Sequence, residues 1–216
     1  MVMGSLGSLD LQELVVDVMQ PTLRKRPFSA DGWLFEPKWD GFRAICYLQE
    51  GRVRFLSRNK RSLTEKFPEL QSIASEVSAV SAILDGEIVA IDDKGMPCFD
   101  RLRSRKKDSG FAVVFYAFDL LYLDGRNLMD EPLLDRKRAL RKLVAKRRPA
   151  GRIRYTDHVL RDGKAFFQKL EIFGLERMVA KRVDSRYRGG RTQVWLKIKT
   201  VAGETETERR SRAWQG

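Results

Sequence analysis

Hydrophobic and polar residues alternate over much of the chain with the two-residue period of β-strands. Alternation from Trp33 onward is followed by the turn Gln49-Glu50-Gly51 and a second short run, which predicts a β-hairpin. Farther on, a run rich in Val, Phe and Tyr ends at Asp124-Gly125 and is typical of a buried strand. The predicted strands cover residues 33–48, 53–56, 82–91, 111–123, 178–183 and 194–198.

Helical periodicity is found in three segments between these strands. Residues 64–77 form the first. Residues 132–146 form the second, which begins with proline and directs its leucines inward and its arginines and lysines outward. Residues 164–173 form the third and end before Gly174, which suits a left-handed helix end. The mixture of helices and strands with short connections favours an α+β fold with antiparallel sheets.

The two ends of the chain are weakly patterned. Residues 1–20 predict an N-terminal arm, whose amphipathic part is either a docked helix or a loose segment, and residues 21–26 predict a basic loop. Residues 200–216 predict a polar, mobile tail. The main domain is therefore expected at residues 21–199.

Charge narrows the choice of partners. The chain has 42 Lys and Arg against 29 Asp and Glu, a formal net charge of +13. Such an excess favours nucleic acid first and an anionic membrane surface second, although a basic protein that merely stays soluble is the alternative. Two cysteines and the single His158 argue against a disulfide scaffold, a zinc site and a histidine-based triad. Without a secretory signal or an apolar run of spanning length, a cytoplasmic location is expected.

The segment FEPKWDGFR, residues 35–43, carries the clearest candidate chemistry. It places Lys38 beside the turn-forming pair Asp40-Gly41 and before Arg43, within a stretch of strand character. A lysine amine can attack a nucleotide phosphate once it is neutral, which requires cationic neighbours or desolvation.

Two lysines near the end of the chain could serve such a reaction. Strand alternation puts Lys197 and Lys199 on one face, where they could grip a phosphate. Without further context, an edge strand with solvated lysines is the more frequent explanation.

Two glutamates next to apolar strands are further candidates. Glu87 follows the turn Asp85-Gly86 and could bind a ribose hydroxyl or a magnesium-bound water, although an ordinary turn and strand is equally consistent. Glu176 precedes a strand that delivers Lys181, and an isolated glutamate of this kind is usually a surface charge.

The order of these segments resembles the nucleotidyltransferase (adenylation) domain of ATP-dependent DNA ligases. Its nucleotidyl-lysine pattern, Lys-x-Asp-Gly-x-Arg, is filled by Lys38, Asp40, Gly41 and Arg43. The later motifs of that domain resemble, in chain order, residues 57–59, 84–87, 116–121, 174–181 and 195–199. The segments FEPKWDG, FDLLYLDG and DSRY are especially similar to the bacterial end-joining ligase D branch.

The resemblance implies a fold and a role for each matched residue. The implied fold is the nucleotidyltransferase (ATP-grasp-like ligase) fold, with antiparallel sheets flanked by helices and a nucleotide pocket between them. Lys38 would attack the α-phosphate of ATP and hold AMP, Glu36 would read the adenine amino group, and Phe118 would stack on adenine, with Tyr116 as its competitor. Magnesium would be bound by Glu87 and Glu176. The implied nucleotide-binding residues are Glu36, Lys38, Arg43, Arg58, Glu87, Phe118, Lys181, Lys197 and Lys199.

Three departures from the family pattern bear on activity. Lys60 and Arg177 stand where glycine is usual, and glycine often marks positive φ or close ligand approach. Arg177 is expected to weaken metal binding by Glu176. The OB-fold domain that ligases carry is absent after Lys199, so the chain is expected to be a piece of a longer protein, a degenerate protein, or a minimal enzyme that borrows the clamp from an end-joining or repair partner.

The expected function is formation of lysyl-AMP from ATP and transfer of AMP to the 5′-phosphate of nicked duplex DNA. Residues 101–107 and 182–191 are expected to contact DNA phosphates, and the protein is expected to be monomeric and located at the nucleoid. A DNA-binding scaffold that has lost the chemistry and an RNA ligase are the alternatives.

Overall fold

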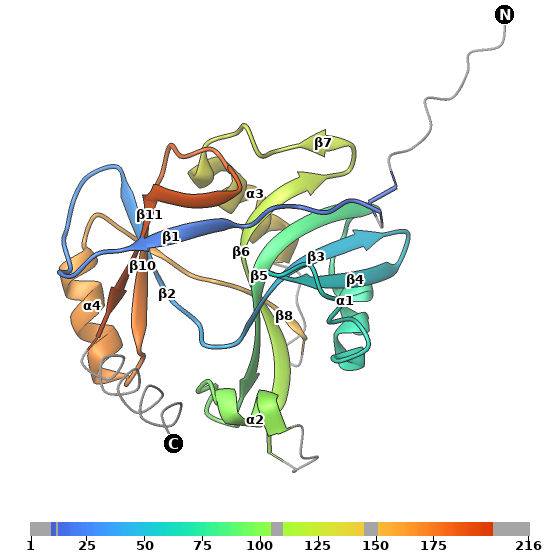
Figure 1. Ribbon diagram of the computed structural model, residues 1–216, viewed down its shortest axis with the longest axis horizontal. Helices are drawn as coiled ribbons and strands as arrows, with labels where there is room; N and C mark the ends of the chain where they lie inside the picture. The colour runs from blue at the N-terminus through green and yellow to red at the C-terminus, as the bar shows by residue number, and fades with distance from the viewer. Residues whose placement is uncertain (1–9, 12, 105–109, 145–150, 201–216) are drawn as a thin grey trace, which may run out of the picture.

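The computed structural model is built on two β-sheets and describes residues 10–11, 13–104, 110–144 and 151–200 (Figure 1). Sheet A has the strand order β1 (Met19–Leu23), β11 (Gly190–Lys199), β10 (Arg177–Arg182), β2 (Trp33–Pro37) and β9 (Val159–Leu160). Sheet B has the order β4 (Arg52–Ser57), β3 (Phe42–Gln49), β5 (Ser81–Ile91), β6 (Ala112–Leu123) and β7 (Arg126–Asn127), and β8 (Ile153–Tyr155) also pairs with β6.

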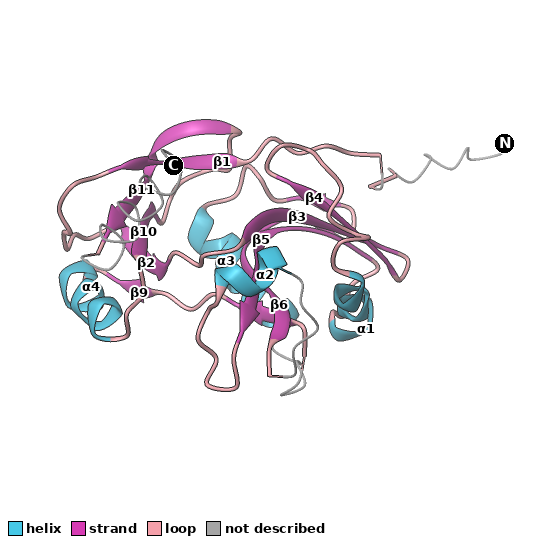
Figure 2. Ribbon diagram, turned by 60° about the horizontal axis from the view of Figure 1, so that its bottom comes forward, coloured by secondary structure: helices cyan, strands magenta, loops and turns pink. Residues whose placement is uncertain are grey.

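Helices lie against the sheets, with α4 beside sheet A and α1 beside sheet B (Figure 2). They comprise a 3₁₀ turn, η1 (Pro68–Ser72), and the helices α1 (Ile73–Glu76), α2 (Phe99–Ser104), α3 (Leu133–Val144) and α4 (Gly163–Ile172). The α+β class is confirmed, and pairing is mostly antiparallel. The β1–β11 and β6–β8 pairs are parallel. Among the described helices, none is long and apolar enough to span a membrane.

A shared core joins the two sheets. Leu34 and Trp195 of sheet A belong to one buried cluster with Ile45, Ile83 and Leu121 of sheet B. Each such side chain contributes roughly 1.5–3 kcal/mol when it is removed from water. The sheets therefore have fixed positions relative to each other, which any site built from both of them requires.

The predicted strand 33–48 is interrupted at the nucleotidyl-lysine motif. β2 ends at Pro37 in sheet A, and β3 begins at Phe42 in sheet B, so residues 38–41 cross from one sheet to the other. Gly41 permits this crossing, because a Cβ there would lie 2.1 Å from the carbonyl oxygen of Ile88. Close approach, rather than positive φ, is what requires glycine at this position.

Three other predictions need correction. Residues 64–77 do not form one helix, since Pro68 starts a 3₁₀ turn and α1 has only four residues. The predicted basic loop 21–26 is partly strand, because β1 extends to Leu23 by pairing with β11. In α3, Arg136 and Lys137 do not point outward; both are buried.

The ends of the described chain pack onto the domain. Leu11 and Met19 of the predicted arm are buried, and the amphipathic stretch between them contains no helix where it is described. Thr200, the one described residue of the predicted tail, is buried and donates its hydroxyl to the carbonyl of Leu175. Residues 201–216 and 105–107, the latter part of a predicted DNA contact, lie outside the described residues.

Candidate active site

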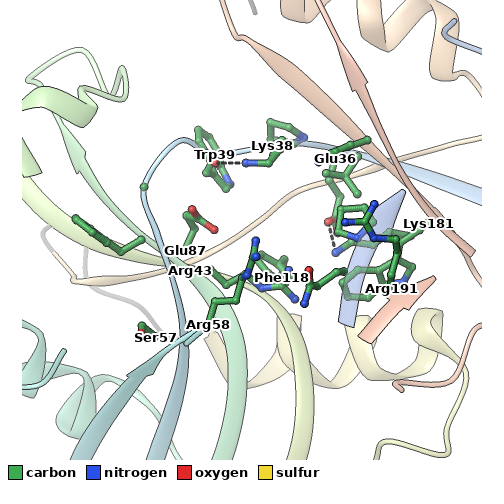
Figure 3. Close-up of a pocket in the computed structure, with 18 of the residues that line it drawn as sticks. Glu36, Lys38, Trp39, Arg43, Ser57, Arg58, Glu87, Phe118, Lys181 and Arg191 are labelled. Atoms are coloured by element: carbon green, nitrogen blue, oxygen red, sulfur yellow. Dashed lines mark hydrogen bonds and ion pairs between the residues drawn. The ribbon is translucent and has the colours of Figure 1, made fainter. Parts of the chain in front are cut away.

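A cavity of about 470 Å³ lies between the two sheets and collects most of the predicted site residues (Figure 3). Its walls come from β1, β2, the 38–41 crossing, the start of β3, the end of β4 and the turn after it, and from β5, β6, β10 and β11. The lining residues are Gln20, Pro21, Glu36, Pro37, Lys38, Trp39, Gly41, Phe42, Arg43, Ser57, Arg58, Asn59, Glu87, Phe118, Val179, Lys181, Arg191, Trp195 and Lys197.

Lys38 is half-buried at the start of the crossing. Its backbone N–H donates to the carbonyl of Arg177 at 2.9 Å, and its Nζ lies 3.4 Å from the carbonyl oxygen of Trp39. Trp39 is itself held, since its ring stacks on Tyr116 at 3.9 Å between centroids and its Nε1 donates to Thr156 Oγ1 at 3.1 Å. The amine is thus carried by a fixed loop rather than by an open turn.

Arg43, the last residue of the motif, is held by a second motif. Its Nε and Nη2 donate to the two carboxylate oxygens of Asp85 at 2.9 and 2.6 Å, and Nη2 also donates to the carbonyl of Met19. Tyr187 donates its hydroxyl to Asp85 at 2.6 Å. The sequence placed Asp85 in a turn, whereas the structure makes it the anchor of Arg43. The sequence offered one indication of a functional position for Asp85, because this residue lies in the family-like segment 84–87.

Glu87 lies in the cavity wall with only 9% of its surface exposed. Burial raises the pKa of its carboxyl group to about 7, although the positive charges of Lys38 and Arg43 act in the opposite direction. Near neutral pH this group therefore changes between a hydrogen-bond donor and an anionic acceptor.

Cations gather at the end of the cavity near Lys38. Burial lowers the pKa of Lys197, and the positive charges of Lys38, Arg177, Arg191 and Arg58 lower it further. A group of like charges is suited to an anionic ligand, because a phosphate relieves their repulsion.

An aromatic surface lies at another part of the same cavity. Phe118 and Trp195 meet edge to face at 6.4 Å, and the Lys181 amine lies 4.3 Å from the centroid of the Phe118 ring. Phe118 lines the cavity, whereas its competitor Tyr116 stacks on Trp39 and is not among the lining residues. This placement favours Phe118 as the partner of a flat base.

Glu36 is the acidic residue of this region and is almost fully buried between two lysines. Lys181 Nζ lies 2.6 Å from its Oε2, and Lys137 Nζ donates to its Oε1. Burial by itself would raise the pKa of Glu36, but the charges of Lys137 and Lys181 outweigh it and hold the pKa below its ordinary value. Glu36 is therefore an anion whose two oxygens are both fixed.

Lys137 was missed by sequence analysis, although a signal existed. Leu133, Arg136, Lys137, Leu140 and Val144 have the spacing of one helix face, and all are buried. Polarity suggested an outward position for the two basic residues, and the helical period was the better guide.

Two predicted residues lie outside the cavity lining. Lys199 pairs with Arg177 across β10 and β11, and the Glu176 carboxylate lies 3.9 Å from the Arg177 guanidinium. Lys60, the other departure from glycine, has φ of +62° and an ion pair with Asp17 at 2.9 Å. Of the two reasons for which glycine is usual at such positions, positive φ is the one that the backbone of Lys60 shows.

The donors present limit how a metal can be held. Across the described ranges, no group of three or more His, Cys, Asp and Glu side chains could hold a metal ion by itself. Magnesium commonly uses one or two carboxylates together with phosphates and water, so Glu87 in the cavity wall fits a metal that arrives with a nucleotide.

Comparison with known proteins agrees with this geometry. The multifunctional non-homologous end joining protein LigD of Mycobacterium bovis is 38% identical over 172 residues, which are 79% of this chain and 22% of the relative. LigD of Pseudomonas aeruginosa is 32% identical over 168 residues, 77% of this chain and 20% of the relative. This chain thus spans about a fifth of the length of these two LigD proteins.

A solved structure gives the same result in three dimensions. Mycobacterial DNA ligase D complexed with ATP and MES matches with a TM-score of 0.76 and 35% identity, over 85% of this chain and 60% of that chain. The predicted nucleotidyltransferase fold and the resemblance to the ligase D branch are thereby confirmed. The family model for the ATP dependent DNA ligase domain matches residues 16–199, and the chain belongs to that family.

Proposed function

We propose that residues 21–199 form an adenylation domain that transfers AMP from ATP to Lys38 and then to the 5′-phosphate of nicked duplex DNA. The observation that carries the proposal is the meeting of three surfaces in one cavity. A half-buried lysine lies beside a cluster of cations, and the same cavity includes the aromatic surface of Phe118 and the anion of Glu36. The lysine can serve as the nucleophile, the cations suit phosphates, and Phe118 together with Glu36 suits a purine that carries an amino group.

The first step exchanges one bond at phosphorus for another. The neutral Lys38 amine attacks the α-phosphorus of ATP, a P–N bond forms, the P–O bond to pyrophosphate breaks, and the amine loses a proton. In the second step the 5′-phosphate of the nick attacks the same phosphorus, and lysine leaves with a proton. Lys197, Arg58 and Arg191 neutralise the phosphate charge and hold its oxygens. Lys199, which lies outside the cavity lining, is proposed to add positive charge to this group.

Magnesium would be held by Glu87, with Glu176 as the second predicted ligand, and would neutralise charge on the ATP phosphates. Arg43 is fixed to Asp85 and presents its guanidinium at the cavity wall, where we assign it to the ribose or the nick phosphate. These roles are inferences from placement and from the resemblance.

The relatives indicate the biological setting. Because the chain spans only part of LigD, its participation in end joining, its dependence on an end-joining or repair partner for a clamp, its monomeric state and its cytoplasmic location at the nucleoid are proposals. Both proteins named above are described as acting in non-homologous end joining.

Intact-mass measurement after incubation with ATP and magnesium tests the proposal. We expect a gain of one AMP in the wild type and none in Lys38→Ala. Lys142→Ala, a change of an exposed lysine on α3, should still gain AMP. An unmodified wild type, with and without nicked DNA, would leave a DNA-binding scaffold as the remaining function.

Competition between nicked DNA and nicked RNA separates the remaining alternative. DNA should take AMP from the labelled protein faster than RNA does. The reverse order would identify an RNA ligase of the same fold.

A further inference from the structure

We propose that Lys137 is a positioning residue that fixes Glu36 for recognition of the purine amino group and thereby sets the choice of nucleotide. The inference rests on the proposed function, because it concerns how the same cavity selects ATP. Lys137 does not line the cavity, so it acts through Glu36 rather than on the nucleotide.

Lys137 belongs to a buried network that joins three parts of the fold. From α3 its Nζ donates to Glu36 on β2 and, at 2.8 Å, to the carbonyl of Thr156 in the segment between β8 and β9. Thr156 in turn accepts the indole N–H of Trp39, the residue next to Lys38. One amine therefore connects the proposed base-reading carboxylate with the loop that carries the nucleophile.

Burial makes this arrangement costly to leave incomplete. The side chains of Lys137 and Glu36 are 0% and 2% exposed, and Lys181, the other partner of Glu36, is 3% exposed. A charge removed from water needs partners, since an unpaired buried charge is strongly destabilising. Burial lowers the pKa of Lys137, and the nearby charge of Glu36 acts against that change. The lysine is thus held in place by the carboxylate that it orients.

A fixed carboxylate discriminates between purines by hydrogen-bond type. It has about four lone-pair directions, of which a hydrogen bond from Lys137 uses one and the Lys181 ammonium faces another at 2.6 Å, so it can accept one more donor. The 6-amino group of adenine is such a donor. A purine with a 6-carbonyl brings an acceptor toward an anion, which is repulsive, and a site of this kind rejects the wrong partner strongly. If Lys137 is removed, Glu36 can rotate or take up a proton, and a protonated carboxyl can donate to the carbonyl.

The test compares ATP with inosine triphosphate, which carries a 6-carbonyl in place of the amino group. Lysyl-nucleotide formation is followed by intact mass under single-turnover conditions, over a range of nucleotide concentrations. We expect the wild type to prefer ATP and Lys137→Met to lose roughly tenfold or more of that preference, mainly through weaker ATP binding. Lys142→Met, on the exposed side of the same helix, should keep the wild-type ratio.

A double-mutant cycle with Glu36→Gln separates positioning from general destabilisation. Loss of Lys137 should reduce discrimination little further once Glu36 is Gln, because both changes act on one group. Equal slowing with both nucleotides, or additive effects, would overturn the proposal.

Controls keep the inference separate from the proposed function and from folding. A wild type that takes up neither nucleotide contradicts the proposed function, whereas a wild type that takes up ATP while Lys137→Met keeps its preference contradicts only this inference. Lys137→Gln keeps donors for Thr156 without the charge and replaces the Met variant if that one does not fold. Failure of both to fold, with Lys142→Met folded, would make Lys137 a structural residue and overturn the proposal.

Discussion

Glu87 is a cavity residue whose burial lowers the stability of the folded protein at high pH. Its folded pKa of about 7 lies above the ordinary 4.5. The folded state therefore keeps a proton that the unfolded state loses, and stability falls as the pH rises from about 4.5 to 7. In nucleotide-free and metal-free protein, Glu87→Gln should raise the free energy of unfolding at pH 8 by up to about 3 kcal/mol.

The same variant should change stability little at pH 4, where Glu87 is protonated in both states. Urea unfolding at the two pH values measures the difference. A variant that is less stable than wild type at pH 8 contradicts the expectation. Lysyl-AMP formation by the variant should be slower, since a carboxylate suited to the nucleotide is lost.

Gly41 gives a second prediction for a single residue. Gly41→Ala should destabilise the protein by roughly 1–3 kcal/mol and slow lysyl-AMP formation, because its Cβ would collide with the backbone of Ile88 and displace the loop of Lys38. Gly32 is the matched control: it has φ of +75° with nothing within 4 Å of an added Cβ. Gly32→Ala should cost about 1 kcal/mol in strain and leave the labelling rate unchanged. Thermal unfolding and intact mass measure both effects, and equal loss of labelling in the two variants would argue against the steric explanation.

What the sequence predicted at this scale depended on short motifs. Lys38, Arg58, Glu87 and Phe118 lie in recognisable segments, and all of them reach one cavity. The partners that hold such residues in place come from elsewhere in the chain, and their identity depends on the fold. Lys137 is 101 positions from Glu36, so no local pattern connects them.

At the scale of elements, α3 is fastened to sheet B by a buried ion pair. Arg136 donates through Nε and Nη2 to the two oxygens of Asp119 at 2.8 Å each, and both side chains are 0% exposed. Arg136→Met should destabilise the protein by about 3–5 kcal/mol, since it leaves a buried carboxylate without its partner. Arg138→Met, two positions along on the exposed side, should leave the melting temperature almost unchanged.

A second substitution checks that explanation. Asp119→Leu in the Arg136→Met background should recover much of the lost stability, because it removes the stranded charge. Calorimetry of the single and double variants measures the recovery. No recovery would mean that helix packing, rather than charge, dominates at this contact.

Element predictions succeeded where the pattern is local and failed where pairing is distant. The predicted apolar strands 82–91 and 111–123 agree to within one residue at each end with β5 and β6. Residues 21–23 have no strand pattern of their own, and their conformation follows from pairing with β11, which is about 170 residues away. Loop and strand cannot be told apart there without the tertiary partner.

For the whole molecule, the net charge of +13 predicts electrostatic binding to DNA. Part of the expected contact segment 182–191 is already engaged, since Arg182 pairs with Asp184, and Arg186 and Arg188 approach Asp130. Exposed pairs of this kind are weak, so phosphates can replace the aspartates. The affinity for nicked duplex DNA should fall linearly with salt on logarithmic axes.

The slope of log affinity against log salt concentration reports the number of phosphate contacts, at about 0.9 for each contact. Replacing Arg186 and Arg188 by Gln should therefore lower the magnitude of this slope by about one to two. Arg138→Gln, which also removes an exposed and paired arginine, should leave the slope unchanged. Fluorescence anisotropy at several salt concentrations measures both. A flat salt dependence in the wild type would contradict phosphate binding.

The place of β11 in sheet A has a consequence for how the protein is made. This strand is the last in the described chain, yet it lies between β1 and β10, the first strand and a late one. Sheet B can assemble as the chain leaves the ribosome, whereas sheet A stays divided until residue 199 has emerged. Lys197 reaches the cavity on that same strand, so an incomplete chain lacks both the finished sheet and one of the cations that line the cavity. The cavity around Lys38 can therefore be completed only after the last strand of the described chain has been synthesised.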